Sequence, residues 1–495
     1  MLSKPVAMLE TNSLANETLP LVAPTGFREY DARWLFGREI NLLGMRALGL
    51  GIGTLIHEKG VTPEIVTGHD FRNYSMAIKD AMILGLVMAG CRVHDIGLAV
   101  SPMAYFAQFA LDVPAVAMVT ASHNENGWTG VKIGLDRPLT LGPADMARLR
   151  DIVLGAQWIA RPGGSLKQVD GMRQAYIDDL VATTRLTRRL KVIAACGNGT
   201  AGAFAPEILR RIGCDVVELD CELDHSFPRY NPNPEDLKML HAMADAVRTH
   251  GADLALGFDG DGDRCGIVDN EGHEIFADKI GVMLARDLSD LHRQARFVVD
   301  VKSTSLFATD PLLLANGATT EYWKTGHSYM KSRTAETGAL AGFEKSGHYF
   351  FGPPYGRGYD DGFVSALAIC RMLDRAGTRS MADLYRALPR TWGTPTMSPH
   401  CGDTVKYGVI DRIVEHFSRQ DSLAGRRISQ LITVNGIRIV LDDGSWGLVR
   451  ASSNKPELVV VCESPVSEAM MRSVFGEIAA HLKTYPEIGA FNQSI

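Results

Sequence analysis

The sequence lacks three features that would each point to a particular class of protein. It has no apolar run near the roughly 18 residues that a membrane-spanning helix needs, and its first 22 residues contain Glu10 and Glu17 without a basic start. Its 51 lysines and arginines are fewer than its 57 aspartates and glutamates, so no overall basic charge attracts nucleic acid or an anionic membrane. Its eight cysteines include no CxxC pair, which argues against a zinc knuckle or a disulfide framework. We therefore expect a cytoplasmic protein without a nucleic-acid or membrane partner.

The chain of 495 residues is too long for one hydrophobic core, because cores stop growing near ~250 to 300 residues. One local pattern recurs three times: a short apolar strand, an amphipathic helix that ends in glycine, and a second strand. The first strands of these units are EIVTG (64–68), KVIAAC (191–196) and RFVVDV (296–301), and the glycines are Gly90, Gly213 and Gly317. Three such units predict three α/β domains of similar architecture.

The two ends of the chain differ in sequence pattern from the three repeated units. The first 22 residues show no periodicity, which is typical of a flexible tail. After about residue 390, a helix-like segment at 405–418 precedes strand-like runs at 432–441, 446–451 and 457–463, which indicates a smaller α+β domain. We therefore predict a flexible tail at 1–22 and domains at 23–165, 166–276, 277–392 and 393–495.

A glycine-rich turn, GNGTAG at 197–202, follows the strand KVIAAC and precedes a helix-like segment. This is the GxGxxG pattern of dinucleotide-binding folds, and an acidic strand end at 218–220 follows about 20 residues later. Taken alone, the turn suggests an NAD-dependent oxidoreductase. The competing interpretation is a tight turn that packs closely between strand and helix.

The strongest chemical signal is the segment DGDGDR at 259–264, which follows the strand-like ADLALGF. Its three carboxylates at alternate positions, with glycines between them, can converge on one hard divalent cation. An EF-hand is excluded, because the required sixth Gly and twelfth Glu are Arg264 and Asn270. Three protein oxygens leave Mg²⁺ partly open, which suits a metal that also contacts a phosphate, and Arg264 could bind the same phosphate.

Three further polar loops offer groups that could carry or bind phosphate and sugar. Ser122, in VTASHNENGWTGVK at 119–132, is a candidate phosphoryl carrier at the end of an apolar strand, beside His123 and before Lys132. Gly-flanked EKSGH at 344–348 presents Glu, Ser and His, which can bond sugar hydroxyls. RASSNKP at 450–456 combines a guanidinium, hydroxyls and an amide in a plausible phosphate cradle. Taken alone, each loop is as well explained by a solvent-exposed turn as by a binding site.

Taken together, these motifs resemble those of the α-D-phosphohexomutases, most nearly the bacterial phosphomannomutase/phosphoglucomutase branch. The resemblance runs from about Phe27 to the C-terminus. Its motifs are FREYDAR (27–33), TASHN (120–124), DGDGDR (259–264), DVKST (300–304), KTGHSYMK (324–331), EKSGH (344–348) and RASSNKP (450–456). Their combined order and spacing are far more specific than the single GxGxxG.

The resemblance implies three similar α/β domains with mixed sheets and a smaller α+β C-terminal domain around a central cleft. It implies movement of a phosphoryl group between O1 and O6 of a hexose, through phosphoserine at Ser122 and a hexose 1,6-bisphosphate, with glucose 1,6-bisphosphate as activator. Mg²⁺ is expected on Asp259, Asp261, Asp263 and the Ser122 phosphate. The expected catalytic residues are Ser122, His123, Lys132, Arg264 and His327, of which the two histidines and the lysine are alternative candidates for proton transfer. The expected substrate-binding residues are Tyr30, Arg33, Lys302, Glu344, Ser346, His348, Arg450, Ser452, Ser453 and Asn454.

The sequence departs from the family pattern at a few positions. Trp34 replaces the glycine that follows Arg33, Glu125 replaces a proline in the serine loop, and Lys455 stands where an acidic residue is usual. The EKSGH loop is similar to the form that reads O3 and O4 of the sugar, which implies use of both mannose and glucose phosphates. A phosphoglucosamine mutase is the alternative within the family. Hexose phosphates are the expected partners of a monomer or dimer.

Overall fold

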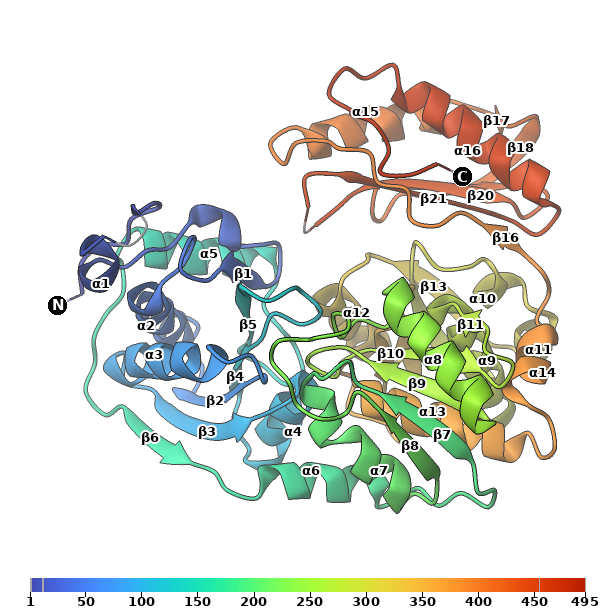
Figure 1. The fold of residues 1–495 in the computed structure, drawn as a ribbon. Helices are drawn as coiled ribbons and strands as arrows, with labels where there is room; N and C mark the ends of the chain where they lie inside the picture. The colour runs from blue at the N-terminus through green and yellow to red at the C-terminus, as the bar shows by residue number, and fades with distance from the viewer. Residues whose placement is uncertain (1, 11–12, 454, 495) are drawn as a thin grey trace. The chain divides into compact units, whose positions relative to one another are not determined.

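The computed structural model describes residues 2–10, 13–453 and 455–494. The chain forms two compact units (Figure 1). Unit 1 comprises Met1–Phe276 and Ser346–Ala382, and unit 2 comprises Ala277–Lys345 and Asp383–Ile495. None of the helices in the described residues is long and apolar enough to cross a membrane.

The first sheet of unit 1 has the strand order β1-β5-β4-β2-β3-β6. Strands β4, β2, β3 and β6 run parallel, whereas β5 and β1 are antiparallel to their neighbours. Central strand β4 is buried along its whole length, because helices cover both faces of a parallel sheet. The strands are β1 (Ala32–Leu35), β2 (Glu64–His69), β3 (Arg92–Leu98), β4 (Ala115–Val119), β5 (Trp128–Gly134) and β6 (Ser165–Gln168).

The helices around this sheet include a closely packed pair, α2 and α3. A Cβ atom on Gly49 of α2 would lie 2.1 Å from the Met82 carbonyl oxygen of α3, and one on Gly85 of α3 would lie 2.1 Å from the Arg46 carbonyl. Glycine is therefore needed where the two backbones meet. The elements are α1 (Ala15–Thr18), η1 (Pro24–Gly26), α2 (Leu42–Glu58), α3 (Ser75–Met88), α4 (Ser101–Ala110) and α5 (Pro143–Leu154).

The N-terminal segment is partly packed against this domain. Val6 donates a backbone hydrogen bond to Pro20, and Leu21 and Val22 are buried. The Asn41 side chain accepts from the backbone N–H of Leu21, which ties the segment to the start of α2. The expected flexible tail at 1–22 is therefore part of the packed structure at its C-terminal end.

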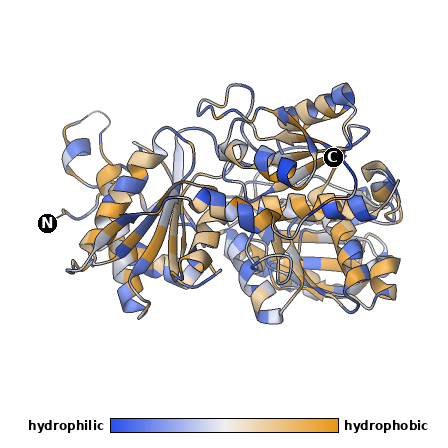
Figure 2. Cartoon of the chain, turned by 90° about the horizontal axis from the view of Figure 1, so that it is seen from below, coloured by the Kyte–Doolittle hydropathy of each residue, from blue (hydrophilic) through white to orange (hydrophobic). Residues whose placement is uncertain are grey.

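The second sheet of unit 1 has the order β11-β10-β9-β7-β8, with β9, β7 and β8 parallel and β10 and β11 antiparallel. In Figure 2 many helices of the chain carry both hydrophobic (orange) and hydrophilic (blue) residues, as expected of amphipathic helices. The elements are α6 (Met172–Val181), β7 (Lys191–Ala195), η2 (Thr200–Ala203), α7 (Ala205–Arg211), β8 (Asp215–Leu219), α8 (Leu237–His250), β9 (Leu254–Phe258), β10 (Cys265–Asp269) and β11 (Glu274–Ile275).

The glycines of GNGTAG make a packed turn between β7 and α7. A Cβ on Gly199 would lie 3.2 Å from the Cα of Gly260, and one on Gly202 would lie 2.1 Å from the Cys221 carbonyl oxygen. The backbone N–H of Thr200, which begins the helical turn, donates to the Gly260 carbonyl. The turn thus contacts the DGDGDR segment, and its first helical N–H already has a hydrogen-bond partner within the protein. The dinucleotide-binding interpretation gains no support from this packing.

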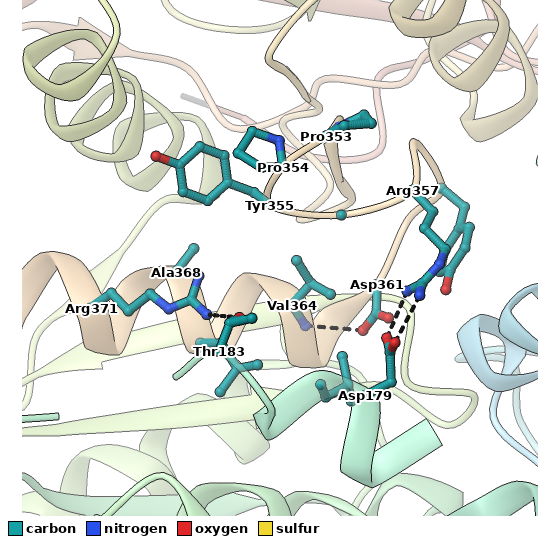
Figure 3. Close-up of a pocket in the computed structure, with 14 residues that line it drawn as sticks. Asp179, Thr183, Pro353, Pro354, Tyr355, Arg357, Asp361, Val364, Ala368 and Arg371 are labelled. Carbon is teal, nitrogen blue, oxygen red and sulfur yellow. Dashed lines mark hydrogen bonds and ion pairs between the residues drawn. The ribbon is translucent and has the colours of Figure 1, made fainter. Parts of the chain in front are cut away.

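The segment Ser346–Ala382 completes unit 1 with β15 (Tyr349–Phe351) and α13 (Gly362–Arg375). Asp361 caps α13 by accepting hydrogen bonds from the backbone N–H groups of Phe363 and Val364. The loop between β15 and α13 passes over the helix (Figure 3). Helix α14 (Met381–Arg386) contains the boundary between the units.

Unit 2 begins with strands β13, β12 and β14, which pair in parallel around central β12. Gly281 of α9 packs close to Phe343 of β14, since a Cβ there would lie 3.2 Å from the ring. The elements are α9 (Ala277–Leu291), β12 (Arg296–Asp300), α10 (Leu306–Thr309), α11 (Pro311–Ala315), β13 (Thr319–Trp323), α12 (His327–Thr337) and β14 (Ala341–Phe343).

The C-terminal part of unit 2 is an antiparallel sheet of order β16-β21-β20-β19-β18-β17 with two helices. The strand expected at 432–441 is wrong in extent, because β18 ends at Ile432 and a turn with Gly436 at φ +71° precedes β19. The elements are β16 (Trp392–Gly393), α15 (Lys406–Ser418), β17 (Ser422–Leu423), β18 (Arg426–Ile432), β19 (Ile437–Leu441), β20 (Trp446–Ala451), β21 (Leu458–Ser464) and α16 (Glu468–Leu482).

A buried polar network joins the two parts of unit 2. Glu463 of β21 bonds Lys279 Nζ of α9 at 2.7 Å and accepts from the hydroxyl and backbone N–H groups of the 304–305 segment. Arg438 of β19 donates to the Val301 carbonyl at 2.7 Å. Removing one partner of such a buried ion pair is costly, so the network holds the C-terminal sheet against α9 and β12. The prediction of three α/β domains and a smaller C-terminal domain is confirmed.

Candidate active site

Ser122 lies in the loop between β4 and β5, with its backbone in the left-handed region at φ +51°. This conformation is uncommon for a residue other than glycine and is held by hydrogen bonds. The Ser122 N–H donates to Thr120 Oγ1 at 2.8 Å, and the Thr120 hydroxyl donates to Asp70 Oδ2 at 2.9 Å. The Ser122 side chain is therefore presented from a fixed loop, although only 3% of the residue is exposed.

The three aspartates of DGDGDR converge beside this serine. They follow β9, all are fully buried, and one carboxylate oxygen of each lies within 4.8 Å of the others. The Ser122 hydroxyl donates to Asp259 Oδ2 at 3.1 Å. Burial and the charges of Asp263 and Asp261 raise the pKa of Asp259 well above its usual value. Crowded carboxylates of this kind need a cation.

Lys132 of β5 supplies one such positive charge. Its Nζ donates to Asp261 Oδ2 at 2.7 Å and also to Asp263 Oδ2. Burial alone would lower the pKa of Lys132, but the charges of Asp261 and Asp263 raise it well above its usual value. Burial alone would raise the pKa of Asp263, but Lys132 and His348 hold it well below its usual value. Lys132 is therefore an ammonium ion that neutralises charge.

The same cluster fits a divalent cation. Asp261 Oδ1 and Asp263 Oδ1 are buried and accept no hydrogen bond within the described residues. Asp261 Oδ2 is also held by the Ser101 hydroxyl at 2.5 Å, which fixes the direction of this carboxylate. Hard carboxylate oxygens on one face, next to a hydroxyl that can carry phosphate, are the donor set that Mg²⁺ prefers.

His123 and Arg264 lie together at the side of Ser122. His123 Nδ1 is 3.1 Å from Ser122 Oγ and accepts from Arg264 Nη2 at 2.9 Å. Burial and the charge of Arg264 lower the pKa of His123 well below its usual value. The imidazole is therefore neutral, and its Nδ1 is an acceptor.

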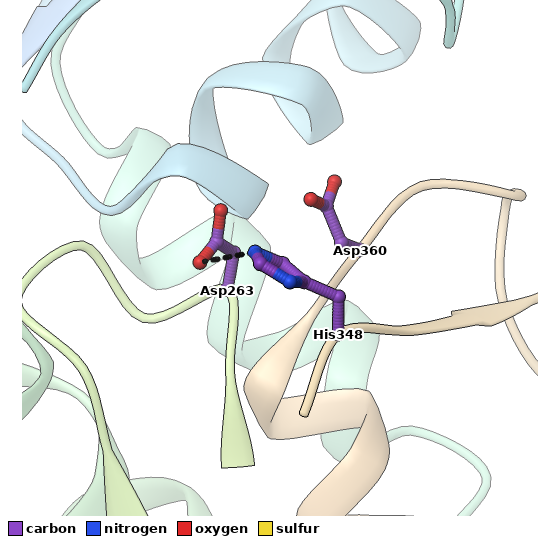
Figure 4. Close-up of side chains that lie close together, drawn as sticks. All are labelled: Asp263, His348 and Asp360. Carbon is purple, nitrogen blue, oxygen red and sulfur yellow. Dashed lines mark ion pairs between the residues drawn. The ribbon is translucent and has the colours of Figure 1, made fainter. Parts of the chain in front are cut away.

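His348 approaches the aspartates from the segment before β15 (Figure 4). Its Nε2 lies 3.5 Å from Asp263 Oδ1 and accepts from Arg264 Nε at 3.3 Å, while its Nδ1 is 3.0 Å from Ser346 Oγ. Arg264 and His348 also face each other in an antiparallel bridge. Buried Asp360 offers an oxygen within 4.8 Å of ligand atoms of Asp263 and His348. Ser346 and His348 are thus brought to the metal loop.

Tyr30 and Arg33 belong to the same unit. Arg33 of β1 donates to the Ala121 carbonyl at 3.1 Å and to Asn124 Oδ1 at 3.2 Å, and its guanidinium pairs with Asp31 at 2.9 Å. It therefore braces the serine loop from the neighbouring strand. Tyr30 is buried.

The remaining expected site residues lie in unit 2. The side chain of Glu344, after β14, accepts from the Gly326 N–H at 2.5 Å, next to His327 at the start of α12. Lys302 Nζ lies 3.8 Å from Asp300 Oδ2. Glu344 and Lys302 therefore follow the carboxyl ends of adjacent parallel strands, where ligands bind in α/β sheets.

The C-terminal loop of RASSNKP follows β20. Arg450 is buried and donates to the Ala451 carbonyl at 2.8 Å, and Ser452 Oγ accepts from the Lys455 N–H at 3.3 Å. Ser453 is half-buried. Asn454 lies outside the described residues.

Sequence analysis missed two groups that position the serine loop. Arg72 donates to the Ser122 carbonyl at 2.9 Å and to the Asn124 carbonyl at 2.6 Å, and it forms an ion pair with Asp70. Both are almost fully buried. The only signal in the sequence was Asp70 and Arg72 directly after the apolar strand EIVTG, at the same sheet edge as Ser122.

Comparisons with known proteins agree along the chain. Models of the family described as phosphoglucomutase/phosphomannomutase, alpha/beta/alpha domains I, II and III, match residues 24–159, 174–272 and 276–392. A phosphomannomutase/phosphoglucomutase of Pseudomonas putida is 33% identical over 90% of this chain and 93% of its own length. A phosphoglucomutase of Neisseria gonorrhoeae is 30% identical over 90% and 94%. The crystal structure of a phosphoglucomutase/phosphomannomutase family protein from Burkholderia thailandensis is similar with a TM-score of 0.85 and 28% identity, covering 94% of this chain and 98% of that one.

Proposed function

Because the chain belongs to the phosphoglucomutase/phosphomannomutase family of the α-D-phosphohexomutases, we propose that Ser122 carries the phosphoryl group in its hexose phosphate mutase reaction. The enzyme is an intramolecular phosphotransferase that interconverts hexose 6-phosphate and hexose 1-phosphate. One observation carries the proposal: the Ser122 hydroxyl bonds Asp259 at 3.1 Å, inside a cluster of three buried carboxylates. A phosphate on this oxygen would lie next to the cation site.

The proposed reaction has two balanced transfers. In the first, the bond between phosphorus and Ser122 Oγ breaks, and a bond forms between phosphorus and a hydroxyl oxygen of the hexose phosphate. The product is a hexose 1,6-bisphosphate, whose other phosphoryl group is returned to Ser122 Oγ in the second transfer. Such transfers depend mainly on positioning and charge neutralisation, for which Lys132 and Arg264 supply cationic groups.

Mg²⁺ would be held by Asp259, Asp261, Asp263 and the Ser122 phosphate. When bound, it supplies charge stabilisation for the transferring phosphoryl group. Glucose 1,6-bisphosphate, the proposed activator, would load Ser122 with its first phosphoryl group.

His123 is proposed to hold the proton of the Ser122 hydroxyl. Its Nδ1 is 3.1 Å from Ser122 Oγ, within reach for proton transfer, and its imidazole is neutral. When Ser122 is phosphorylated its proton passes to Nδ1, which requires that the Arg264 N–H turn away from this nitrogen, and the proton returns when Ser122 leaves phosphorus. Lys132 is bonded to two carboxylates and is better suited to charge neutralisation. His327 remains a candidate for the sugar hydroxyl proton.

We propose that the residues expected to contact the substrate bind it as the sequence predicts. Tyr30, Arg33, Lys302, Glu344, Ser346 and His348 would bind the hexose, and Arg450, Ser452, Ser453 and Asn454 the distal phosphate. We propose activity on both mannose and glucose phosphates, since the Pseudomonas relative is named for both activities. We propose domain boundaries at 23–165, 166–276, 277–392 and 393–495, of which the first three enclose nearly all of the family matches at 24–159, 174–272 and 276–392. All eight cysteines are free in the described residues, which supports a reducing compartment such as the cytoplasm.

A ³¹P NMR time course tests the proposed substrates. The enzyme with Mg²⁺ and a trace of glucose 1,6-bisphosphate is given mannose, glucose or glucosamine 1-phosphate in separate samples. We expect the first two signals to convert to 6-phosphate signals and EDTA to stop the conversion. Fast conversion of glucosamine 1-phosphate alone would replace the dual mannose and glucose assignment by the phosphoglucosamine alternative.

A further inference from the structure

A pocket lies in unit 1 between α6, α13 and the loop that follows β15 (Figure 3). Its volume is about 320 Å³, within the range of small-molecule sites. None of the residues that line it is an expected catalytic, metal or sugar-binding residue. The pocket therefore needs an explanation of its own.

The middle of the pocket is apolar. Val364, Leu367 and Ala368 lie on one face of α13, because residues three and four apart share a helix face. Pro353 and Pro354 of the loop and Leu180 of α6 provide the facing surfaces. The Tyr355 ring stands beside the two prolines over the same helix face (Figure 3). The planar tyrosine ring and the apolar proline rings suit contact with a flat apolar ligand.

The end near Asp361 consists of polar groups that already have partners. Arg357 forms a two-bond ion pair with Asp179, at 2.6 and 2.8 Å. Asp361 accepts from the Tyr176 hydroxyl at 2.7 Å and caps α13. At this end the Arg357 and Asp179 charges are paired with each other, and Asp361 already bonds other groups of the protein.

The opposite end holds a cation with no counter-charge. Arg371 donates to the hydroxyls of Thr183, at 3.1 Å, and Thr184. Over the chain as far as the structure describes it, no carboxylate lies within ion-pair distance of the Arg371 guanidinium. Burial and the nearby Arg375 lower the pKa of Arg371, which means that both destabilise the charged guanidinium. A bound anion would offset this destabilisation. Asp361 and Arg371 are ten residues apart on the helix, which separates the two polar ends by about 15 Å.

We propose that this pocket binds a small organic anion, a carboxylate or phosphate monoester attached to a flat apolar ring, with the anionic group on Arg371. The ring contacts Val364, Leu367 and Ala368 on one side and the Pro353–Tyr355 loop on the other. A guanidinium binds either anion through two parallel hydrogen bonds. The site is independent of the mutase reaction, since it shares no residue with the cluster around Ser122.

Ligand-observed NMR on the Mg²⁺-loaded enzyme tests this site, with phenyl phosphate, benzoate and neutral benzyl alcohol as probes. Saturating glucose 1,6-bisphosphate is present throughout, so that probes bound in the hexose phosphate site are displaced. We expect both anions to bind and to compete with each other, and benzyl alcohol to bind about tenfold more weakly. Absence of anion binding under these conditions, or equal binding of the neutral probe, would overturn the proposal.

Three variants locate the binding. Arg371→Gln should weaken both anions about tenfold or more, and Ala368→Phe should block all three probes by filling the apolar middle. Arg375→Gln removes the same charge one turn further along α13, outside the pocket, and should change binding by less than about twofold. The mutase rate of each variant reports its folding. Equal weakening by Arg375→Gln, or unchanged binding in both Arg371→Gln and Ala368→Phe, would contradict a site in this pocket.

Discussion

The ammonium group of Lys132 lies 2.7 Å from Asp261 Oδ2 and also bonds Asp263, two of the three carboxylates proposed to hold Mg²⁺. The lysine comes from β5 and the aspartates from the loop after β9, so two neighbouring sheets of unit 1 meet at this ion pair. A fixed positive charge at this distance repels an incoming divalent cation while it lowers the charge of the cluster. Lys132 should therefore weaken Mg²⁺ binding while it supports turnover.

The Lys132→Met variant should bind Mg²⁺ more tightly and turn over more slowly than the wild type. The repulsion between two unit positive charges about 5 Å apart is about 3 kcal/mol at an effective dielectric constant near 20, and it doubles for a divalent cation. Removing the Lys132 charge should therefore raise the affinity for Mg²⁺ at least about a hundredfold. Turnover should fall because phosphoryl transfer loses a neutralising cation. Titration calorimetry with Mg²⁺ measures the first effect and the coupled rate the second. Exposed Lys167→Met is the control, and weaker Mg²⁺ binding in Lys132→Met would contradict the account.

The Ser122→Ala variant should lose turnover by on the order of 10⁴-fold or more, because no other hydroxyl among the residues that the structure describes bonds Asp259. Its melting temperature should stay close to that of the wild type, since the Thr120 and Arg72 bonds go to the backbone of residue 122. Steady-state kinetics and thermal unfolding report the two quantities. Ser473→Ala, on an exposed position of α16 in unit 2, is the matched control.

The Arg72→Gln variant should be both less stable and slower. It leaves buried Asp70 charged without its partner, which costs about 3–5 kcal/mol, and it removes two bonds to the serine loop. The double variant Asp70→Asn with Arg72→Gln should recover part of the stability but not the rate. Urea unfolding and kcat for both variants separate the effects. A double variant with wild-type kcat would show that Arg72 only stabilises the fold.

The Glu463→Gln variant should lose stability in a pH-dependent way. Burial would raise the pKa of Glu463, but Lys279 and the Ser305 N–H hold it well below its usual value. A lowered pKa in the folded state contributes stability that is fully present above the unfolded pKa of about 4.3 and is lost as pH falls below it. The loss in Glu463→Gln should therefore be about 3–5 kcal/mol at pH 7 and shrink below about pH 4.

Urea unfolding of the wild type and Glu463→Gln at pH 7, 4 and 3 checks this pH dependence. Glu468→Gln, which breaks the exposed pair with Arg472, should cost less than about 1 kcal/mol at each pH. A difference between wild type and Glu463→Gln that stayed constant over this range would contradict the assigned charge state.

Much of the fold and site was predictable because the signals are local. The strand before DGDGDR and the three aspartates are contiguous, so their convergence follows from a short loop after β9. The strands expected at 64–68, 191–196 and 296–301 correspond to β2, β7 and β12, since each is a short β-rich apolar run before a helix. The motif set also identified the family that the comparisons confirm.

The contacts that complete the site join residues far apart in sequence, and no local pattern encodes them. Arg72 and Ser122 are 50 residues apart, and Ser101 and Asp261 are 160 apart. The strand expected at 432–441 was wrong because Asn435-Gly436, a dipeptide typical of hairpin turns, was counted as part of the strand. The packing of Leu21 and Val22 depends on Asn41, which a composition argument for a tail does not include.

The most direct test of the central claim is mass spectrometry of the protein after incubation with glucose 1,6-bisphosphate and Mg²⁺, followed by a chase with mannose 1-phosphate. With ¹⁸O-labelled phosphoryl groups on the bisphosphate, the account predicts one added labelled group on the peptide that contains Ser122 and no labelling in Ser122→Ala. During the chase the labelled group is replaced by the unlabelled phosphoryl group of the sugar, because the second transfer phosphorylates Ser122 again. Labelling of a different residue that discharges to the sugar, or turnover by an enzyme that is never phosphorylated at Ser122, would contradict it.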